Sequence, residues 1–559
     1  MVRSKLFLPL LACLLIAPSL AWGQSDFRFD KAIWPNDLRI RGTVIAWNGS
    51  DVPESIVDSF YETVTEDEAT IVSIWLGETP NESTQNLAER FENAAQFEQF
   101  NIGVEVEGSA EYAKLKKLIG SATGVWINGL APEENQRELL SSLKPALNQL
   151  LSDGGVVVVA GEAFDWAGHT VVKQDEEADH PIRNSAGVNL FPDTVITKKP
   201  NKGDAVPTTT LNPRLVRASV SENTGMILAG RKIITVGDGD VEFRLMANSE
   251  KPARVLAVEQ FNRRPDPYTD LIDLTAWRRD AIDRTLPQFP PAEIVQPNVE
   301  NGTLLIVGGG GMPKGLFDEF IELAGGKDAK LIYVPCSEAE TVPRSRLVSS
   351  WRRKVASAHM LHTKDRTEAD SDEEFLKHLS EATGIWFGGG RQWNFVDSYY
   401  GTKAHQLMLD VLDRGGVVGG SSAGASIQGE YLARANPVAN FDIMAPGYER
   451  GLGFISGVAI DQHFSQRRRQ KDMTRLVDTY PQLLGIGLDE STAIVVQKSE
   501  AKVVGRGRVF FYDRNQPVVS GEDDFIALSA GQKFDLAKRE LIEEENNDDE
   551  DPGEDQKDE

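Results

Sequence analysis

The sequence repeats itself at a separation of about 260 residues, a period as long as a whole domain. The matching segments occur in the same order in both halves of the 559-residue chain. A duplication of this length predicts two similar domains of ordinary size in tandem. The four pairs of matching segments are 42–49 with 302–309, 122–126 with 382–386, 151–157 with 412–418, and 222–225 with 490–493.

Each half alternates short apolar runs with helix-like segments. Continuously apolar strands that alternate with helices are typical of a parallel sheet covered on both faces. We therefore predict an α/β fold of two tandem three-layer domains with mainly parallel sheets. In the second half the expected strands are 304–307, 331–334, 384–387 and 417–420, and the expected helices are 315–324, 373–379 and 402–412.

The N-terminus has the pattern of a secretory signal peptide. Arg3 and Lys5 precede an apolar stretch from Leu6 to Ala17, and Ala21-Trp22-Gly23 offers a small-x-small cleavage site. The stretch is too short to span a bilayer, and no later segment resembles a transmembrane helix. We expect residues 1–23 to be removed and the protein to be exported, to the periplasm or outside the cell.

The remaining chain divides by composition. Proline is frequent in residues 262–299, which we interpret as a linker between a domain of residues 24–261 and a domain of residues 300–542. Residues 543–559 are mostly acidic and predict a disordered tail. The net charge of −26 argues against a nucleic-acid partner, because phosphate binding needs clustered lysine and arginine. No pattern indicates a metal or a cofactor, and a homodimer is left open.

Residues 415–425 contain the motif that most directly indicates chemistry. An apolar, strand-like run ends in Gly420-Ser421-Ser422-Ala423-Gly424, which fits the G-x-S-x-G pattern of a nucleophile elbow. Small flanking residues let the serine occupy a strained turn between strand and helix, where its hydroxyl is exposed. N–H groups at the start of the new helix can stabilise an oxyanion. Ser422 is therefore the candidate nucleophile.

A serine nucleophile needs a base, and the base needs an orienting group. His463 is the only histidine after Ser422, and it follows the strand-like run 458–460. Two carboxylates are candidates for orienting it. Glu490 precedes a strand-like segment and is preferred, whereas Asp442 would give the Ser…Asp…His order of an α/β-hydrolase esterase.

The first half lacks these chemical groups. Gly161 stands where the second half has Ser422, and residues 193–199, where a counterpart of His463 is expected, contain no histidine. We interpret the first half as a degenerate copy that serves as a scaffold or a substrate platform.

Two further segments are interpreted as structural. Cys336 ends a strand-like run without a glycine-rich elbow, which indicates a buried thiol rather than a nucleophile. Residues 308–311 are four glycines that lack the Lys-Ser/Thr of a phosphate-binding loop. They predict tightly packed backbone near the active site.

Three ordered motifs give the second half a resemblance to a known family. The motifs are Gly-Gly-Ser-Ser-Ala-Gly-Ala around Ser422, Asp-Gln-His-Phe with following arginines around His463, and Gly-Ile-Gly-Leu-Asp-Glu-Ser-Thr-Ala around Glu490. They resemble the serine peptidase family that holds cyanophycinase and dipeptidase E, over residues 302–513. The resemblance implies a class I glutamine amidotransferase-like fold, a serine-type peptidase, and a peptide or arginine/aspartate polymer as substrate.

The resemblance also implies roles for individual residues. Ser422 would be the nucleophile, His463 the base and Glu490 the group that holds His463. The oxyanion hole would come from N–H groups of Ala423, Gly389 and Gly390. The residues that match the family's substrate pocket are Gln392, Asp461, Gln462, Arg467 and Arg469. Such a pocket must bind a free carboxylate, which arginine does bidentately, and a guanidinium, which Asp461 or glutamates can bind.

Two positions depart from the family pattern. Arg391 replaces the aspartate of Gly-Gly-Asp-Gln, and Asp472 stands where a further arginine is expected. Both alter the charge beside the predicted pocket and leave the substrate open. Two other functions remain as alternatives: an exported binding protein without catalysis, and the esterase that uses Asp442. An amidotransferase is disfavoured because its nucleophile is a cysteine.

Overall fold

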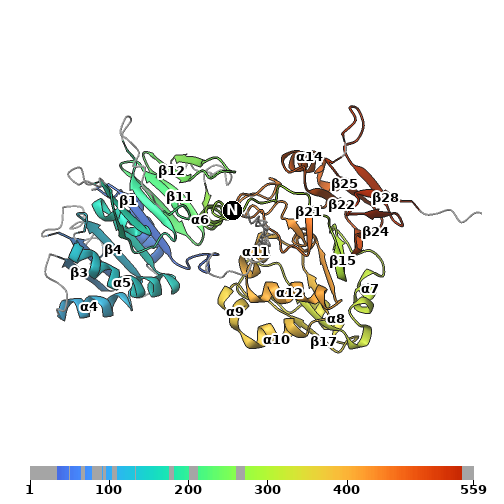
Figure 1. The fold of residues 1–559 in the computed structure, drawn as a ribbon. Coiled ribbons are helices and arrows are strands. Elements are labelled where there is room, and N and C mark those ends of the chain that lie inside the picture. Colours follow the sequence, from blue (N-terminus) through green and yellow to red (C-terminus); the bar gives the residue numbers. More distant parts are fainter. Residues whose placement is uncertain are drawn as a thin grey trace, which may run out of the picture.

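The chain forms two lobes, which we call the first lobe (residues 34–259 and 272–273) and the second lobe (residues 299–543), in a computed structural model (Figure 1). The described residues are 34–49, 51–64, 69–77, 91, 96–102, 110–132, 134–174, 182–200, 212–259, 271–515 and 517–543. The predicted signal peptide and the acidic tail beyond Glu543 lie outside them. Within these ranges no helix combines the length and the apolar character that crossing a membrane requires.

The first lobe is built on an eight-stranded sheet. Five neighbouring strands are parallel, and the three at one edge are antiparallel to their neighbours. In spatial order the strands are β3 (Gln96–Ile102), β2 (Thr70–Leu76), β4 (Gly124–Gly129), β5 (Val156–Ala160), β1 (Thr43–Asn48), β10 (Thr224–Ala229), β11 (Lys232–Gly237) and β14 (Ile272–Asp273).

The second lobe is built on a nine-stranded sheet of the same plan. Five strands are again parallel, and four antiparallel strands extend the same edge. In spatial order the strands are β17 (Ser357–Met360), β16 (Lys330–Val334), β18 (Gly384–Phe387), β19 (Val417–Ser421), β15 (Val299–Val307), β23 (Thr492–Lys498), β24 (Glu500–Gly505), β27 (Lys533–Asp535) and β28 (Glu540–Ile542). The prediction of mainly parallel sheets is confirmed, whereas the antiparallel edge was not predicted.

Each lobe also carries a smaller mixed sheet. In the first lobe it contains β8 (Thr194–Lys198), β9 (Val216–Val220), β12 (Asp240–Leu245) and β13 (Arg254–Glu259), and a separate hairpin contains β6 (Thr170–Gln174) and β7 (Ile182–Ala186). In the second lobe it contains β20 (Gly429–Tyr431), β21 (Ile455–Gln462), β22 (Leu484–Leu488), β25 (Arg508–Tyr512) and β26 (Ile526–Ser529).

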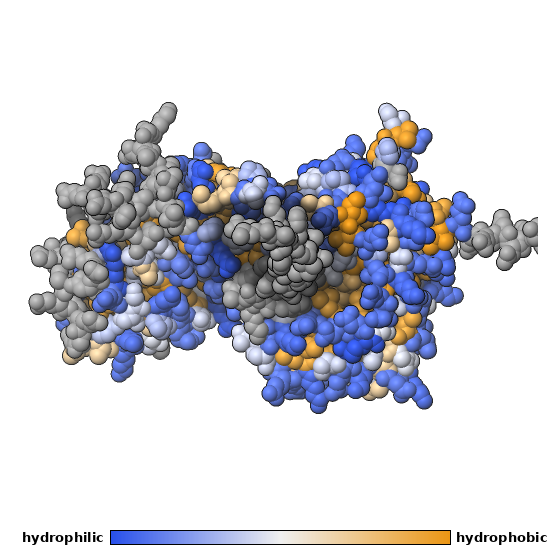
Figure 2. All heavy atoms as spheres, viewed as in Figure 1, coloured by the Kyte–Doolittle hydropathy of each residue, from blue (hydrophilic) through white to orange (hydrophobic). Residues whose placement is uncertain are grey.

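Helices cover both faces of each large sheet. In β15, alternate residues enter two different cores, Leu304 and Ile306 on one face and Leu305 and Val307 on the other. The first-lobe helices are α2 (Glu54–Val64), α4 (Ala110–Ile119) and α5 (Glu134–Ser152). The second-lobe helices are α7 (Leu316–Leu323), α8 (Arg346–Trp351), α9 (Arg366–Ser371), α10 (Glu373–Glu381), α11 (Trp393–Tyr399), α12 (Lys403–Asp413), α13 (Ala423–Ser426) and α14 (Gln470–Thr479). Hydrophilic residues dominate the visible surface of both lobes (Figure 2).

The expected linker contains a buried helix, so the linker interpretation is wrong for residues 272–283. β14 pairs with β11, and α6 (Leu274–Asp283) follows it with all of its residues buried. Trp277 and Ala281 enter the first-lobe core, while Ala276 and Ile282 enter the second-lobe core. The prolines that suggested a linker lie outside this helix. Figure 1 shows α6 between the two lobes.

Candidate active site

Ser422 occupies a strained position between β19 and α13. Its backbone has φ 58° and ψ −113°, a region that non-glycine residues rarely enter, and its N–H donates to Val307 O at 3.0 Å. The flanking glycines are required because a Cβ on Gly420 would collide with the carbonyl of Gly424. A side chain on Gly424 would in turn collide with the carbonyl of Phe387. These contacts explain the spacing of the G-x-S-x-G motif.

His463 comes from the smaller sheet of the second lobe. It directly follows β21, has φ 50°, and its N–H donates to Gly308 O at 2.8 Å. Its Nε2 lies 3.0 Å from Ser422 Oγ, within hydrogen-bond distance. The serine and the imidazole therefore meet from two different sheets.

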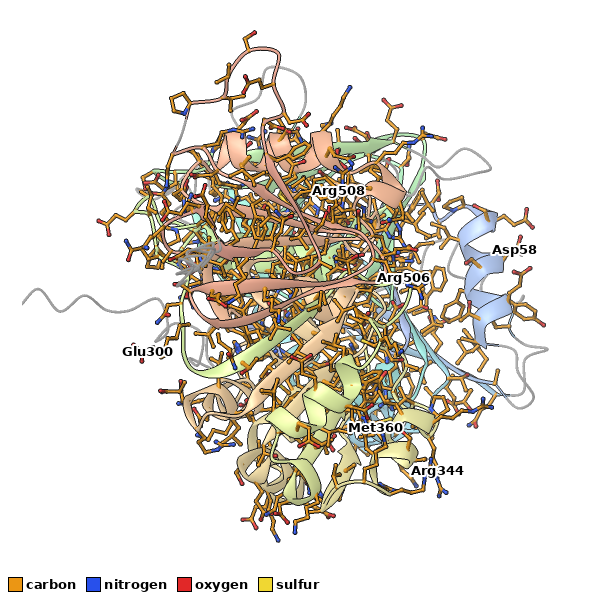
Figure 3. The ribbon with its side chains drawn as sticks, turned by 90° about the vertical axis from the view of Figure 1, so that its right-hand side faces the viewer. Asp58, Glu300, Arg344, Met360, Arg506 and Arg508 are labelled. Atoms are coloured by element: carbon orange, nitrogen blue, oxygen red, sulfur yellow. The ribbon has the colours of Figure 1, made fainter. Side chains whose placement is uncertain are left out.

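Glu490 lies between β22 and β23 and completes a chain of hydrogen bonds. Its Oε1 is 2.6 Å from His463 Nδ1, so Nδ1 carries the proton and Nε2 faces Ser422 as an acceptor. Its backbone N–H donates to Gln466 Oε1 at 3.0 Å. Asp489 accepts the N–H groups of Ser465 and Arg508; Arg506 lies on the turn between β24 and β25, and Arg508 begins β25 (Figure 3). This turn thus supports the segment that carries Glu490.

The four-glycine turn packs against the imidazole and the carboxylate, as predicted for backbone near the site. Gly309 has φ 93°, and a Cβ built on it would lie 2.6 Å from His463 Nε2. A Cβ on Gly310 would lie 2.5 Å from the carboxyl carbon of Glu490. Only glycine leaves room for the two side chains.

We expect Gly309→Ala to lower kcat by about 100-fold, because the new methyl group displaces the His463 ring from Ser422. Gly315→Ala is the matched control: Gly315 has φ 83°, but a Cβ there meets nothing within 4 Å. Steady-state kinetics and thermal melting of both variants separate the two effects. Equal losses of kcat in the two variants would show that backbone strain alone is responsible.

The surroundings of His463 keep its imidazole neutral. Burial lowers the pKa below its ordinary value, and the charges of Arg467 and Arg469 lower it further, against the opposing effect of Glu490. A neutral imidazole is the form that accepts the serine proton.

The acid limb of the pH profile of kcat/KM is accordingly expected below pH 6.5, the ordinary pKa of histidine. Activity rises with pH through this pKa, because protonated His463 cannot act as a base. Arg467→Gln removes a charge that lowers the pKa, so the limb should move to higher pH. Arg468→Gln is the control, since Arg468 is exposed and is absent from the groups that shift His463. A limb that stays in place in Arg467→Gln contradicts this account.

Two backbone N–H groups next to Ser422 are available for an oxyanion. Among the described residues, the N–H groups of Gly389 and Ala423 have no hydrogen-bond acceptor, whereas Gly388 N–H donates to Val334 O. A Cβ on Gly389 would lie 3.4 Å from Ser422 Cβ, which places this turn beside Ser422. The N–H of Gly390, the third predicted donor, likewise has no acceptor among the described residues, and a Cβ on Gly390 would lie 2.9 Å from Cys336 Cβ.

Of the five predicted pocket residues, four are buried and Arg467 is exposed. Asp461 is fully buried, and its two oxygens accept hydrogen bonds from Arg434 and Arg469 at 2.8 Å each. Burial lowers the pKa of Arg469 to about 10 despite this partner. The expectation that Asp461 binds a guanidinium of the substrate is therefore unsupported, because its oxygens already hold two guanidinium groups. Arg467, by contrast, is exposed.

The two glutamines of the predicted pocket are buried. Gln392 Nε2 donates to Ala433 O and Arg434 O at 2.6 and 2.9 Å. These bonds connect the turn of residues 388–392, which we call the oxyanion turn, to the loop that follows β20. Gln462 follows Asp461 directly and is 4% exposed, and its Oε1 has no hydrogen-bond partner among the described atoms. The side-chain oxygen of Gln462 is therefore a buried acceptor without a partner among the described residues.

Arg434 was missed by the sequence analysis. Its guanidinium bonds Asp461 at 2.8 Å, Asp472 at 2.6 Å and the carbonyl of Phe441 at 2.6 Å. It thereby neutralises Asp472, one of the two departures from the family pattern. The other departure, Arg391, donates to the carbonyls of Asn436 and Pro437 at 3.2 Å. In the sequence, Arg434 is a single cation after a short apolar run and belongs to no motif.

Asp442 and Cys336 take no part in the hydrogen-bonded chain of Ser422, His463 and Glu490. Asp442 accepts a hydrogen bond from Arg475 at 2.7 Å, and the carboxylate on His463 Nδ1 is that of Glu490. The geometry therefore gives no support to an esterase that uses Asp442. Burial raises the pKa of the Cys336 thiol to about 12, and the thiol donates to Arg391 O, as expected for a structural cysteine.

In the first lobe, Gly161 lies at the position that Ser422 takes in the second. It directly follows β5 and has φ 73°, close to the 58° of Ser422. The strand β8, whose place in the smaller sheet is that of β21, ends at Lys198 and is followed by Lys199 rather than a histidine. The two positions that correspond to Ser422 and His463 thus hold a glycine with a similar φ and a lysine.

Comparison with known proteins identifies the second lobe. The family model Peptidase family S51 matches residues 303–504. A cyanophycinase of Geminocystis herdmanii is 30% identical over 205 residues, which cover 36% of this chain and 75% of that protein. A cyanophycinase of Synechococcus elongatus is 31% identical over 201 residues, and the chain spans 62% of its length.

A solved structure of a peptidase from an acI-B1 Actinobacterium is 23% identical and aligns with 42% of this chain and 97% of its own. Its TM-score of 0.33 is too low to show a shared fold. The family assignment rests instead on the sequence matches, with the peptidase unit in the lobe that contains Ser422. The chain belongs to peptidase family S51, a family of serine-type peptidases.

Proposed function

We propose that this protein is an exported serine peptidase that cleaves peptide or isopeptide bonds next to aspartate. Ser422 is the nucleophile, His463 the general base and Glu490 the orienting group. One observation carries the proposal: Ser422 Oγ lies 3.0 Å from His463 Nε2, and His463 Nδ1 lies 2.6 Å from Glu490 Oε1. This order of groups is what activating a serine hydroxyl requires.

The chemistry follows from the positions of these atoms. Ser422 Oγ attacks the carbonyl carbon of the substrate while His463 Nε2 takes the hydroxyl proton. The N–H groups of Ala423 and Gly389 stabilise the oxyanion of the tetrahedral intermediate. His463 then gives its proton to the leaving amine, and water releases the acyl group from Ser422 by the same route in reverse.

The substrate that we propose is a peptide or an arginine-bearing aspartate polymer, such as multi-L-arginyl-poly-L-aspartate cleaved to β-Asp-Arg. The name cyanophycinase of the relatives supports this class. Arg467 is exposed next to His463 and is free to bind a carboxylate of the substrate bidentately. Asp461 is already occupied, so recognition of a guanidinium group falls to other carboxylates.

We further propose that the first lobe is a degenerate copy of a class I glutamine amidotransferase-like domain. The five parallel strands have the same topological order in the two large sheets, and Gly161 has an elbow-like backbone. Both observations support this origin. The signal-like N-terminal sequence supports export.

The test is to incubate the protein with a fluorophosphonate probe, and in parallel with the polymer, β-Asp-Arg and α-Asp dipeptides. We expect one covalent adduct, mapped to Ser422 by mass spectrometry, and release of β-Asp-Arg from the polymer. Cleavage of α-Asp dipeptides alone would keep the peptidase mechanism and reject the polymer as substrate. A folded protein that reacts with neither probe nor substrate would support the binding-protein alternative.

A further inference from the structure

A guanidinium from the first lobe lies against the helix that follows the oxyanion turn. Arg231 stands with Gly230 in the two-residue turn between β10 and β11, and it is 9% exposed. Its Nε and Nη2 donate to both oxygens of Asp273 at 2.6 and 2.9 Å. Because Asp273 belongs to β14 and also caps α6, this bidentate contact fixes the guanidinium plane relative to the first-lobe sheet.

The same guanidinium contacts two residues on one face of α11. Its Nη1 donates to Asp397 Oδ2 at 2.6 Å, and its carbon lies 4.6 Å from the centre of the Trp393 ring. Asp397 also accepts a hydrogen bond from Tyr448 OH at 2.6 Å, and the tyrosine oxygen accepts one from Arg231. Figure 1 shows α11 on the side of the second lobe that faces the first.

Asp397 depends on this contact from the other lobe. It is 1% exposed, and among the described residues Arg231 is the one cation within ion-pair distance of it. Burial acts to raise the pKa of Asp397, but Arg231, with Lys364, Arg279 and the Tyr448 hydroxyl, outweighs burial and lowers it, so the carboxylate is charged. A buried charge without its partner is strongly destabilising. Arg231 therefore helps to fix the position of Asp397, together with the hydroxyl of Tyr448.

α11 connects this contact to the oxyanion turn. The helix begins at Trp393, immediately after the turn of residues 388–392, and the rise from Gln392 to Asp397 is only about 7.5 Å. A two-turn helix moves as one body, so a shift at Asp397 is passed to Gly389. An oxyanion donor that moves by about 1 Å no longer reaches the developing charge at its best distance of about 2.7–3.1 Å.

We propose that Arg231 is a positioning residue through which the first lobe fixes the oxyanion turn beside Ser422. The proposal gives the first lobe a role in the reaction, and it rests on the proposed peptidase function for its effect on rate. It makes the second lobe dependent on a lobe that has no nucleophile or base of its own.

The decisive variant is Arg231→Lys in the full-length protein. Lysine keeps the charge beside Asp397 and so avoids an unpaired buried carboxylate, but it cannot hold Asp273 and Asp397 at once in fixed geometry. We expect the rate of Ser422 labelling by a fluorophosphonate, and kcat, to fall by about 10- to 100-fold, with little change in KM. Hydrogen exchange of the amides in residues 388–394 should become faster.

Arg278→Lys is the matched control. Arg278 of α6 is also buried, and it makes a similar fork to Asp193 together with a bond to Asp37 O, so these partners all lie in the first lobe. We expect it to leave labelling, kcat and exchange of residues 388–394 within about twofold of wild type. Equal losses in both lysine variants, or wild-type behaviour of Arg231→Lys, would overturn the proposal.

A second variant covers the case in which Arg231→Lys does not fold. Asp397→Asn keeps the size of the side chain and its bond to Arg231 while removing the charge, and it should reproduce the kcat loss and the faster exchange in part. Unchanged exchange in that variant counts against the proposal. If wild-type protein does not react with the probe, the proposed function fails, and hydrogen exchange still decides whether Arg231 fixes the turn.

Discussion

We expect Ser422→Ala to lower kcat by up to about a million-fold, by comparison with triad deletions in other serine peptidases. The physical reason is the loss of the hydroxyl that lies 3.0 Å from His463 Nε2. Binding of the substrate should persist, because no pocket group is removed. Single-turnover kinetics with the best substrate of the panel, together with a binding measurement, check both statements.

Ser421→Ala is the control for this variant. Ser421 is the last residue of β19, pairs with Val307 in the sheet, and offers a neighbouring hydroxyl in the same motif. We expect its kcat to stay near that of wild type and its adduct with the fluorophosphonate to remain. A large loss of kcat in Ser421→Ala, with activity retained in Ser422→Ala, would contradict the assignment of Ser422 as nucleophile and indicate Ser421 instead.

The second large effect is expected from Glu490→Gln, with a loss in kcat of about 10⁴-fold. The amide of glutamine can donate to Nδ1, which moves the imidazole proton to Nε2, and Nε2–H cannot accept the proton of Ser422. The carboxylate lies 2.6 Å from Nδ1, so the substitution acts directly on this bond. The pH profile and kcat of the variant measure the effect.

Asp442→Asn is the matched comparison for Glu490→Gln. Asp442 forms a partly exposed ion pair with Arg475, and such pairs contribute little, about 0–1 kcal/mol. We expect activity within about twofold of wild type. The opposite ranking of the two variants would restore the esterase that uses Asp442.

Much of the fold could be predicted from local sequence pattern. The expected strand 384–387 is β18 with the same bounds, and the expected helix 402–412 is α12, at Lys403–Asp413. These elements are continuously apolar or strongly periodic, so burial alone fixes their type. The helix α6 was missed because prolines around it dominated the composition of the segment, and its burial depends on contacts with both lobes.

The candidate site likewise contains residues that the sequence identified and residues that it did not. Ser422, His463 and Glu490 were selected from motifs, and the structure brings their side chains together. Asp461 was also selected, but one of its oxygens is occupied by Arg469 and the other by Arg434, a residue without any motif of its own. A charged residue indicates a substrate contact only when its partners within the protein are known. Arg434 is separated from Asp461 by 27 residues, so the motif around Asp461 does not reveal this partner.

The sequence by itself determined the duplication, the alternation of strands and helices, and the chemical types at the elbow and around the histidine. These are properties of local pattern, and side-chain periodicity and glycine spacing encode them directly. Only the tertiary structure decided that the serine and the histidine come from different sheets, and that Arg231 of one lobe reaches Asp397 of the other. Such pairings depend on how sheets and lobes pack, which no short stretch of residues specifies.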